Sequence, residues 1–349
     1  MKLAIVVGTR PEILKVAPVI KELEQRQIKH QVYFTSQHFT ASMGKSFFEE
    51  LGIKVSDEFG IAFDVDLCRQ WLERKFNEYK PTCVLVHGDT SSALVGMLAA
   101  IQAKIPVGHI EAGLRSYDFN EPFPEEYNRV LIDSVATYMF CPTSENLKAV
   151  KPKNEDCRKA FLTGNTIIDL IKSYNIEVKP KKQILITMHR RENWERMERI
   201  CKALSDLSKK FKDREFIFVK HANKKLATQI KSYLEGSNVL LINPQKHRDF
   251  VELMAESELI ISDSGGIIEE ASYLGVPVIS VREKTERLEA FILGNGILSG
   301  TDTKSIVRIV TYLLNSPQIY ESITEARCPF GAGNSAKKIV DILEESETQ

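Results

Sequence analysis

Carboxylate and imidazole side chains recur in this sequence at places suited to proton transfer. Asp89, Glu111 and His189 each follow a short apolar run, and Glu125 lies in the proline-flanked segment 120–128, which we expect to be a loop. A positioned base can remove a proton from a carbon, and cations or proton donors can stabilise a departing anionic group. These residue types therefore predict acid-base chemistry at a carbon that lies next to a leaving group.

Each of these residues also has a purely structural explanation. Asp89 could cap a helix that begins near Ser91, Glu111 could pair with Arg115, and Glu125 could be a solvated loop charge. Taken one at a time, the two interpretations are about equally good. The shared location of the residues at predicted strand ends favours the functional one.

A glycine-rich turn predicts an anion site in the second half of the chain. Residues 264–266 (SGG) join an apolar strand to a helix expected over 267–274. Glycines let a ligand approach the backbone, and the N–H groups at a helix start favour an anion such as a pyrophosphate. Glu270, one turn inside the helix, could accept hydrogen bonds from ribose hydroxyls, whereas Glu269 could face solvent. The alternative is a tight turn in which Ser264 only caps the helix.

Two cations lie near the first predicted turn. Arg10 falls in the turn after the first apolar strand, and Lys15 follows one helical turn later. Both could balance phosphate charge. The alternative, two solvated cations at a helix start, is mildly disfavoured by the helix dipole.

Alternating apolar runs and amphipathic stretches must position these residues. Such alternation is typical of an α/β protein with parallel sheets. The first half predicts strands at 3–7, 31–35, 83–87, 107–110, 138–141 and 160–163, and the second half at 183–188, 215–220, 239–242, 259–262 and 276–281. We therefore expect two Rossmann-like, doubly wound domains with a ligand cleft between them.

The domain boundary is expected where the pattern lapses into polar, lysine-rich sequence at 171–182. This places one domain at 1–170 and a second at 171–333. The last helix, within 334–349, could pack on either domain.

Composition excludes several classes of protein. Forty-seven basic residues balance 47 acidic ones, which argues against nucleic acid as a partner. The six cysteines and seven histidines lack metal-site spacing, so no metal is predicted. His109 lies within an apolar run, which favours a hydrogen-bonded core position, while His87 fits either role. No signal peptide or membrane span is expected, and we predict a cytoplasmic protein.

Eight segments together resemble the non-hydrolysing UDP-N-acetylglucosamine 2-epimerases, a family with two Rossmann-like domains in the GT-B arrangement. They are GTRPE at 8–12, HGDT at 87–90, HIEAGLR at 109–115, PEE at 124–126, TGNT at 163–166, HRREN at 189–193, DSGG at 263–266 and residues 282–287. They occur in the family's order and cover nearly the whole chain.

The resemblance implies an isomerase that interconverts UDP-N-acetylglucosamine and UDP-N-acetylmannosamine. UDP leaves C1 as the C2 proton is removed, which gives a 2-acetamidoglucal, and UDP returns after reprotonation on the opposite face. No cofactor is required. The resemblance also implies a homodimer and a place in polysaccharide biosynthesis.

The resemblance carries site residues over to matching positions. The acid-base and leaving-group residues are Asp89, Glu111, Glu125 and His189. The UDP contacts are Arg10, Lys15, Gln245, Phe250, Ser264, Gly265, Gly266, Glu270 and Arg287.

The chain departs from the bacterial pattern at three places. The segment 55–69 is short, QHFT at 37–40 keeps part of a glutamine-rich motif, and Trp194 and Glu195 stand where a glycine often follows. The first two regions help bacterial members bind an activating UDP-N-acetylglucosamine, so such activation is not predicted here. Alternative functions are epimerisation of a modified UDP-sugar, a hydrolysing epimerase, a GT-B glycosyltransferase and a nucleotide-sugar binding module.

Overall fold

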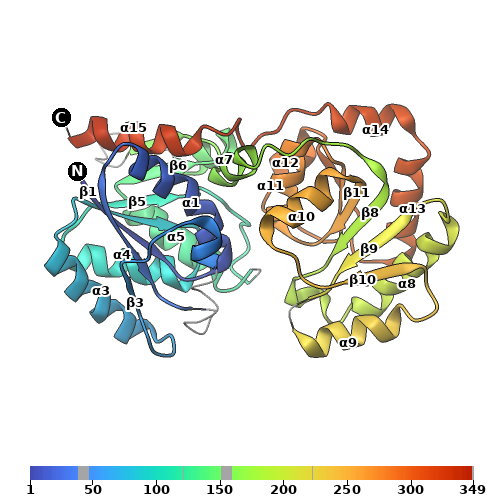
Figure 1. The fold of residues 1–349 in the computed structure, drawn as a ribbon, viewed down its shortest axis with the longest axis horizontal. Helices are drawn as coiled ribbons and strands as arrows, with labels where there is room; N and C mark the ends of the chain where they lie inside the picture. The colour runs from blue at the N-terminus through green and yellow to red at the C-terminus, as the bar shows by residue number, and fades with distance from the viewer. Residues whose placement is uncertain (38–46, 121, 151–158, 222, 348–349) are drawn as a thin grey trace. The chain divides into compact units, whose positions relative to one another are not determined.

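The computed structural model describes residues 1–37, 47–120, 122–150, 159–221 and 223–347. The chain divides into two compact units. Unit 1 comprises Met1–Leu170 and Gly331–Gln349, and unit 2 comprises Ile171–Phe330 (Figure 1). Each unit is an α/β structure built around its own parallel sheet.

The described part of unit 1 contains a seven-stranded sheet in the order β3-β2-β1-β4-β5-β6-β7. Its strands are β1 (Lys2–Val7), β2 (Lys29–Phe34), β3 (Asp57–Glu58), β4 (Cys83–His87), β5 (Val107–Ile110), β6 (Tyr138–Cys141) and β7 (Lys159–Leu162). Its helices are α1 (Arg10–Gln25), α3 (Val65–Tyr79), α4 (Ser91–Gln102), α5 (Glu125–Val135), α6 (Ser144–Val150), α7 (Thr166–Ser173) and α15 (Ser335–Glu347).

Helices cover both faces of this sheet. Helices α3, α4 and α5 pack side by side on one face, while α1 and α15 pack together on the other. Strand β4 is buried along its whole length, which accounts for its apolar residues from Cys83 to Val86. On α1, the predicted apolar face at Ile13, Val16, Ile20 and Leu23 is buried.

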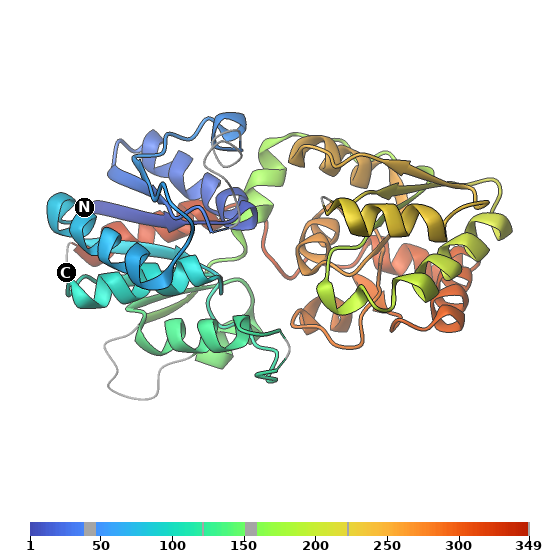
Figure 2. The same ribbon diagram turned by 90° about the horizontal axis from the view of Figure 1, so that it is seen from below.

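The C-terminal helix belongs to unit 1. Arg26, the C-cap residue of α1, contacts Asp341 and Glu344 of α15 at 2.7 and 2.6 Å. The terminal ammonium of Met1 lies 2.5 Å from a carboxylate oxygen of Glu347. Figure 2 shows this red helix among the blue and teal elements of unit 1.

The described part of unit 2 contains a six-stranded sheet in the order β10-β9-β8-β11-β12-β13. Its strands are β8 (Lys181–Thr187), β9 (Glu215–Val219), β10 (Val239–Ile242), β11 (Ser257–Ser262), β12 (Val278–Ser280) and β13 (Gly296–Leu298). Its helices are η1 (Arg191–Asn193), α8 (Met197–Lys210), α9 (Lys224–Tyr233), α10 (His247–Ala255), α11 (Gly265–Leu274), α12 (Leu288–Ile292), α13 (Thr303–Leu314) and α14 (Pro317–Thr324).

Both sheets are doubly wound, because the strand order reverses direction once in each. The reversal lies between β1 and β4 in the first sheet and between β8 and β11 in the second. Every described strand pair is parallel. In such sheets ligands bind outside the carboxyl ends of the strands at the point of reversal. The predicted fold class, two doubly wound parallel-sheet domains, is confirmed.

Two local predictions were wrong. The expected linker at 171–182 is shorter, because α7 continues to Ser173 and β8 begins at Lys181. The segment 120–128 is not all loop, because α5 begins at Glu125.

Candidate functional site

The first turn of unit 1 is shaped by a glycine and a buried carboxylate. A Cβ at Gly8 would meet side-chain oxygens of Ser92 and Thr35 at 1.9 and 2.1 Å, so no larger residue fits. Glu12 accepts hydrogen bonds from the backbone N–H groups of Gly8 and Thr9 at 3.0 and 2.7 Å. This carboxylate therefore holds the turn that carries Arg10.

Glu12 also connects this turn to the loop after β4, because the Thr90 hydroxyl donates to its other carboxylate oxygen at 2.6 Å. Burial raises the pKa of Glu12 to about 7, against the opposing effect of its hydrogen bonds. Arg10 packs its guanidinium over the Phe47 ring at 4.9 Å. Two loops at the sheet reversal are thus tied together through one acidic group.

Glu111 and Lys15 meet at the carboxyl end of β5. Lys15 forms a buried ion pair with Glu111, and Asn165 donates to the same carboxylate at 3.0 Å. His87 Nε2 lies 3.9 Å from it. The suggested alternative of a pair between Glu111 and Arg115 is wrong, and so is the picture of Lys15 as a solvated cation. Arg115 instead pairs with Asp133 at 2.6 Å.

The two histidines of this region differ in their surroundings. Burial lowers the pKa of His87 to about 3, so its imidazole is neutral. His109 is fully buried and lies 2.6 Å from Asp133 and 2.8 Å from the Gly88 carbonyl oxygen, which confirms its predicted hydrogen-bonded core position. Burial opposes ionisation of Asp133, yet His109 and Arg115 lower the pKa of this carboxyl.

Asp89 is held by helix α5. Its side chain pairs with Arg129, and its carbonyl oxygen accepts from Asn128 at 2.8 Å. It does not cap α4, because Thr90 occupies the N-cap and accepts from the Ala93 N–H at 3.0 Å. The alternative assignment of Asp89 as a cap is therefore wrong.

Glu125 occupies the first position of α5, where a carboxylate interacts favourably with the helix dipole. The next residue, Glu126, is buried and accepts from the backbone N–H groups of Ser116 and Tyr117 at 2.9 and 3.2 Å. It also lies 3.3 Å from Arg129. Glu125 is therefore the first residue of α5. Glu126 and Arg129, further along the same helix, hold the neighbouring loops through their hydrogen bonds and ion pairs.

In unit 2, Asp263 fixes the loop that carries His189. This fully buried carboxylate accepts from the backbone N–H groups of His189 and Arg190 at 2.8 and 3.1 Å and from Asn193 at 2.9 Å. The exposed His189 ring lies 2.6 Å from the Thr187 hydroxyl. The two loops at the second sheet reversal are therefore joined, as in unit 1.

The predicted anion site is the start of α11. Ser264 stands at the N-cap but its side chain makes no capping hydrogen bond, so the cap explanation is not supported. A Cβ at Gly265 would lie 2.5 Å from Nη1 of Arg287, whereas a Cβ at Gly266 would have only the Ser264 hydroxyl, at 3.9 Å, nearby. Gly265 therefore makes room for a guanidinium at the helix start.

An ion network holds this arginine in place. Arg287 contacts Glu269 at 2.7 Å and Glu286 at 2.5 Å, and the latter also contacts Arg190 and Arg282, both at 2.8 Å. Burial works against ionisation of Glu286, but the three arginines hold the pKa of this carboxyl well below its usual range. The network keeps three guanidinium groups beside the start of α11.

The remaining predicted UDP contacts lie on neighbouring elements. Phe250 is half-buried on α10, and Gln245 precedes this helix, with its amide donating to the Asn243 carbonyl at 2.6 Å. Glu270 is buried and lies 3.2 Å from His247. Glu269, which could have faced solvent, is 1% exposed, and that alternative is wrong.

The structure thus gathers the predicted residues into two sets. Unit 1 holds Arg10, Lys15, Asp89, Glu111 and Glu125, and unit 2 holds His189, Gln245, Phe250, Ser264, Gly265, Gly266, Glu270 and Arg287. Sequence reasoning gave no role to Glu12, Asn165, Asp263 or Glu286, although all four lie within the quoted motifs. Their positions inside those motifs were the signal that could have identified them as residues of the site.

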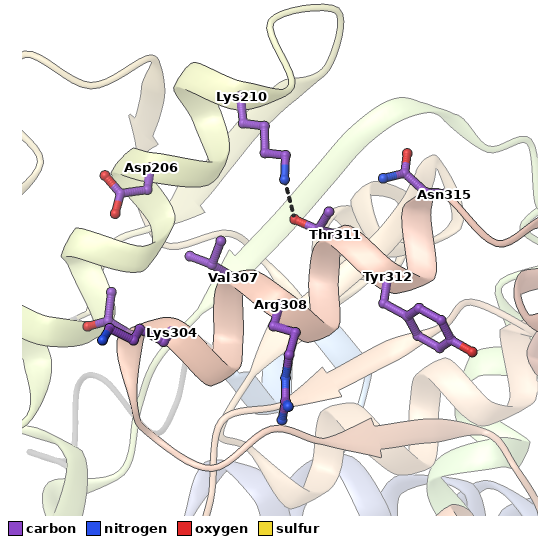
Figure 3. Close-up of a pocket in the computed structure, with 9 residues that line it drawn as sticks. Asp206, Lys210, Lys304, Val307, Arg308, Thr311, Tyr312 and Asn315 are labelled. Carbon is purple, nitrogen blue, oxygen red and sulfur yellow. Dashed lines mark hydrogen bonds between the residues drawn. The ribbon is translucent and has the colours of Figure 1, made fainter.

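A separate groove lies on unit 2 between α8 and α13 (Figure 3). It is lined by Asp206, Lys210, Thr303, Lys304, Val307, Arg308, Thr311, Tyr312 and Asn315, none of which is a predicted site residue. Lys210 donates to the Thr311 hydroxyl across it at 3.2 Å.

Two absences concern only the described part of the chain. No described group of three or more His, Cys, Asp or Glu residues is arranged to hold a metal ion. No helix within the described ranges is long and apolar enough to cross a membrane.

Comparisons with known proteins give a consistent result. A family model described as UDP-N-acetylglucosamine 2-epimerase matches residues 21–344. The enzyme of that name from Neisseria meningitidis serogroup A is 38% identical over 378 aligned residues, with 98% of this chain and 99% of the relative covered. The Escherichia coli K12 enzyme is 37% identical, with 98% of each chain covered.

Solved structures agree. The Neisseria meningitidis UDP-GlcNAc 2-epimerase bound to UDP-GlcNAc has a TM-score of 0.90 and 36% identity, with 99% of this chain and 100% of that chain covered. The Methanocaldococcus jannaschii enzyme in complex with UDP-GlcNAc and UDP has a TM-score of 0.84 and 34% identity, with the same coverage.

Proposed function

This chain belongs to the UDP-N-acetylglucosamine 2-epimerase family, and we propose that it interconverts UDP-N-acetylglucosamine and UDP-N-acetylmannosamine without hydrolysis. The observation that carries the proposal is the chemical division between the two sets of site residues. Unit 1 offers carboxylates for proton transfer, and unit 2 offers a glycine-rich helix start beside an arginine network. Epimerisation by elimination needs both.

In the proposed reaction a base removes the proton at C2 while the C1–O bond breaks and its electron pair leaves with UDP. The result is a 2-acetamidoglucal and UDP. Proton delivery to the opposite face of C2 and return of the UDP oxygen to C1 give the epimer. No net oxidation or reduction occurs, so the reaction consumes no cofactor.

The helix start of α11 is the proposed diphosphate site. Its backbone N–H groups and dipole favour an anion, and Arg287 adds a fixed positive charge. Arg10 and Lys15 are the proposed cations of unit 1. Phe250 and Gln245 are proposed contacts of the uridine, and Glu270 is the proposed partner of the ribose.

The acid-base work is assigned to Asp89, Glu111 and Glu125, with His189 assisting the departing UDP. Asp89 and Glu111 each form an ion pair with a buried cation, Arg129 and Lys15 respectively. We further propose that the two sets act on the same substrate molecule, because the elimination needs a base at C2 and cations at the departing UDP. Binding of UDP-GlcNAc by the meningococcal relative supports the proposed substrate. A cytoplasmic location, expected from the sequence, and a homodimer, implied by the resemblance to the family, complete it.

Product analysis tests the proposal. The purified protein is incubated with UDP-N-acetylglucosamine, without added metal or acceptor, and the nucleotides and sugars are separated. The proposal expects UDP-N-acetylmannosamine with the total of UDP-sugars unchanged. Free UDP with free N-acetylmannosamine would instead show a hydrolysing epimerase. An unchanged substrate would favour one of three other functions: epimerisation of a modified UDP-sugar, transfer of a sugar to an acceptor, or binding of a nucleotide-sugar without catalysis.

A further inference from the structure

Three polar side chains of unit 2 form a hydrogen-bonded row. The Tyr174 hydroxyl lies 2.9 Å from Nδ1 of His247, and Nε2 of the same imidazole lies 3.2 Å from Oε1 of Glu270. The three residues come from different elements: Tyr174 directly follows α7, His247 begins α10, and Glu270 lies in α11. Because His247 and Glu270 are only 6% and 7% exposed, water competes little for these bonds.

The row specifies where the imidazole proton lies. A neutral imidazole has one nitrogen that donates and one that accepts. A phenol that donates to Nδ1 places the imidazole proton on Nε2, and the Nε2–H then donates to the carboxylate of Glu270. Tyr174 thus acts on Glu270 through His247, much as a hydrogen-bond partner orients a histidine that ligates a metal.

Tyr174 is itself held against α10. The guanidinium of Arg248 lies 5.7 Å from the centre of the Tyr174 ring, and its Nη2 donates to the Tyr174 carbonyl at 3.4 Å. The ring centres of Tyr174 and His247 are 5.7 Å apart. These contacts limit the rotation of the phenol away from the histidine.

The second oxygen of Glu270 is the one that the row does not engage. Its Oε2 atom is buried, yet it has no hydrogen-bond partner among the described residues. A buried carboxylate oxygen without a donor is costly, and native structures seldom leave one so. A hydroxyl donor from a bound molecule would satisfy it.

We propose that Tyr174 and His247 are positioning residues that aim the free oxygen of Glu270 at a ribose hydroxyl, and that they thereby set the preference for ribonucleotides. The inference rests on the proposed function, in which Glu270 binds the ribose of a UDP-sugar. It adds two residues that the sequence motifs did not indicate. Neither touches the ligand in this account.

The test compares UDP with 2′,3′-dideoxy-UDP, which lacks both ribose hydroxyls, by calorimetric titration of the full-length protein. The readout is selectivity, the ratio of the two dissociation constants. Loss of a hydrogen bond to a charged group corresponds to about tenfold or more, so we expect the wild type to prefer UDP by at least about tenfold. Glu270→Ala should reduce the ratio to near one.

The positioning variants should reduce the same ratio. His247→Leu removes both nitrogens and should lower selectivity by about tenfold, while Tyr174→Phe should lower it by about threefold. His247→Gln keeps a donor and should retain part of the selectivity. Tyr320→Phe is the matched control, because its hydroxyl bonds the Glu258 carbonyl at 2.8 Å in the same unit, and it should keep wild-type selectivity.

The possible outcomes distinguish a failure of the proposed function from a failure of the positioning role. A wild type that binds neither nucleotide contradicts the proposed function and the inference with it. A wild type that binds both equally overturns the ribose role of Glu270. Wild-type selectivity in Tyr174→Phe and His247→Gln, with selectivity lost in Glu270→Ala, overturns the positioning role alone. Should His247→Leu fail to fold by thermal melting, Tyr174→Phe and His247→Gln decide.

Discussion

Lys15 and Glu111 form a buried ion pair that joins helix α1 to the end of β5. Each side chain is 8% exposed, so the pair is largely shielded from solvent. The sequence suggested separate tasks for them, phosphate binding for one and proton transfer for the other. Their contact places a buried cation directly against the candidate base.

This contact predicts a strong coupling between the two positions. Lys15→Met should lower the free energy of unfolding by about 3 kcal/mol, because it leaves a buried carboxylate without its ammonium partner. The double variant Lys15→Met, Glu111→Gln should recover much of that loss, because the charge is removed as well. Urea unfolding of the wild type, both single variants and the double variant gives the coupling energy. Strictly additive effects would argue against the ion pair.

Glu12 predicts a pH-dependent stability. Its pKa is about 7 in the folded protein and near 4.5 when unfolded, so the folded state binds more protons between these values. The free energy of unfolding should therefore fall as pH rises from 4.5 to 7, by roughly 3 kcal/mol from this group. Glu12→Gln, which cannot ionise, should lack this contribution.

The measurement is the difference in unfolding free energy between wild type and Glu12→Gln at pH 5 and at pH 8. Other titrating groups, such as His87 with its pKa lowered to about 3, affect both proteins alike and cancel. The wild type should lose stability relative to the variant at the higher pH. An identical pH dependence in both proteins would show that Glu12 titrates normally.

Substitution by alanine should affect stability differently at the two glycines of α11. Gly265→Ala would place a methyl group 2.5 to 2.9 Å from the Arg287 guanidinium, which two carboxylates hold in place. This overpacking should cost about 2 kcal/mol of stability. Gly266→Ala meets no described side chain closer than 3.9 Å and should leave stability unchanged or slightly higher. Thermal melting of the two variants compares them directly, and equal destabilisation would contradict the assigned role of Gly265.

Much of the fold was predictable because buried parallel strands are nearly continuous apolar runs. The bounds of β4, β5, β6 and β10 agree with the sequence prediction. Two strands were missed, β3 with two residues and β13 with three, because such short segments carry no usable period. Helix α5 was partly mistaken for a loop, since prolines flank its first residues and its N-cap is Pro124 instead of a polar cap residue.

The clustering of the predicted residues near the two sheet reversals was predictable for the same reason, since the carboxyl ends of neighbouring parallel strands meet there. The ion pairs among these residues could not be predicted from the sequence. Lys15 and Glu111 are 96 residues apart, and Arg190 and Glu286 are also 96 apart, so no local pattern links them. The alternative that paired Glu111 with Arg115 drew on a residue four positions away, because only short-range partners can be suggested from spacing.

The central claim is that inversion at C2 proceeds by proton removal and UDP elimination. Proton NMR of the protein with UDP-N-acetylglucosamine in deuterated water tests it most directly. The account predicts UDP-N-acetylmannosamine with deuterium at C2, and deuterium entering the same position of the remaining substrate. Epimerisation that retains the original hydrogen at C2 would contradict it.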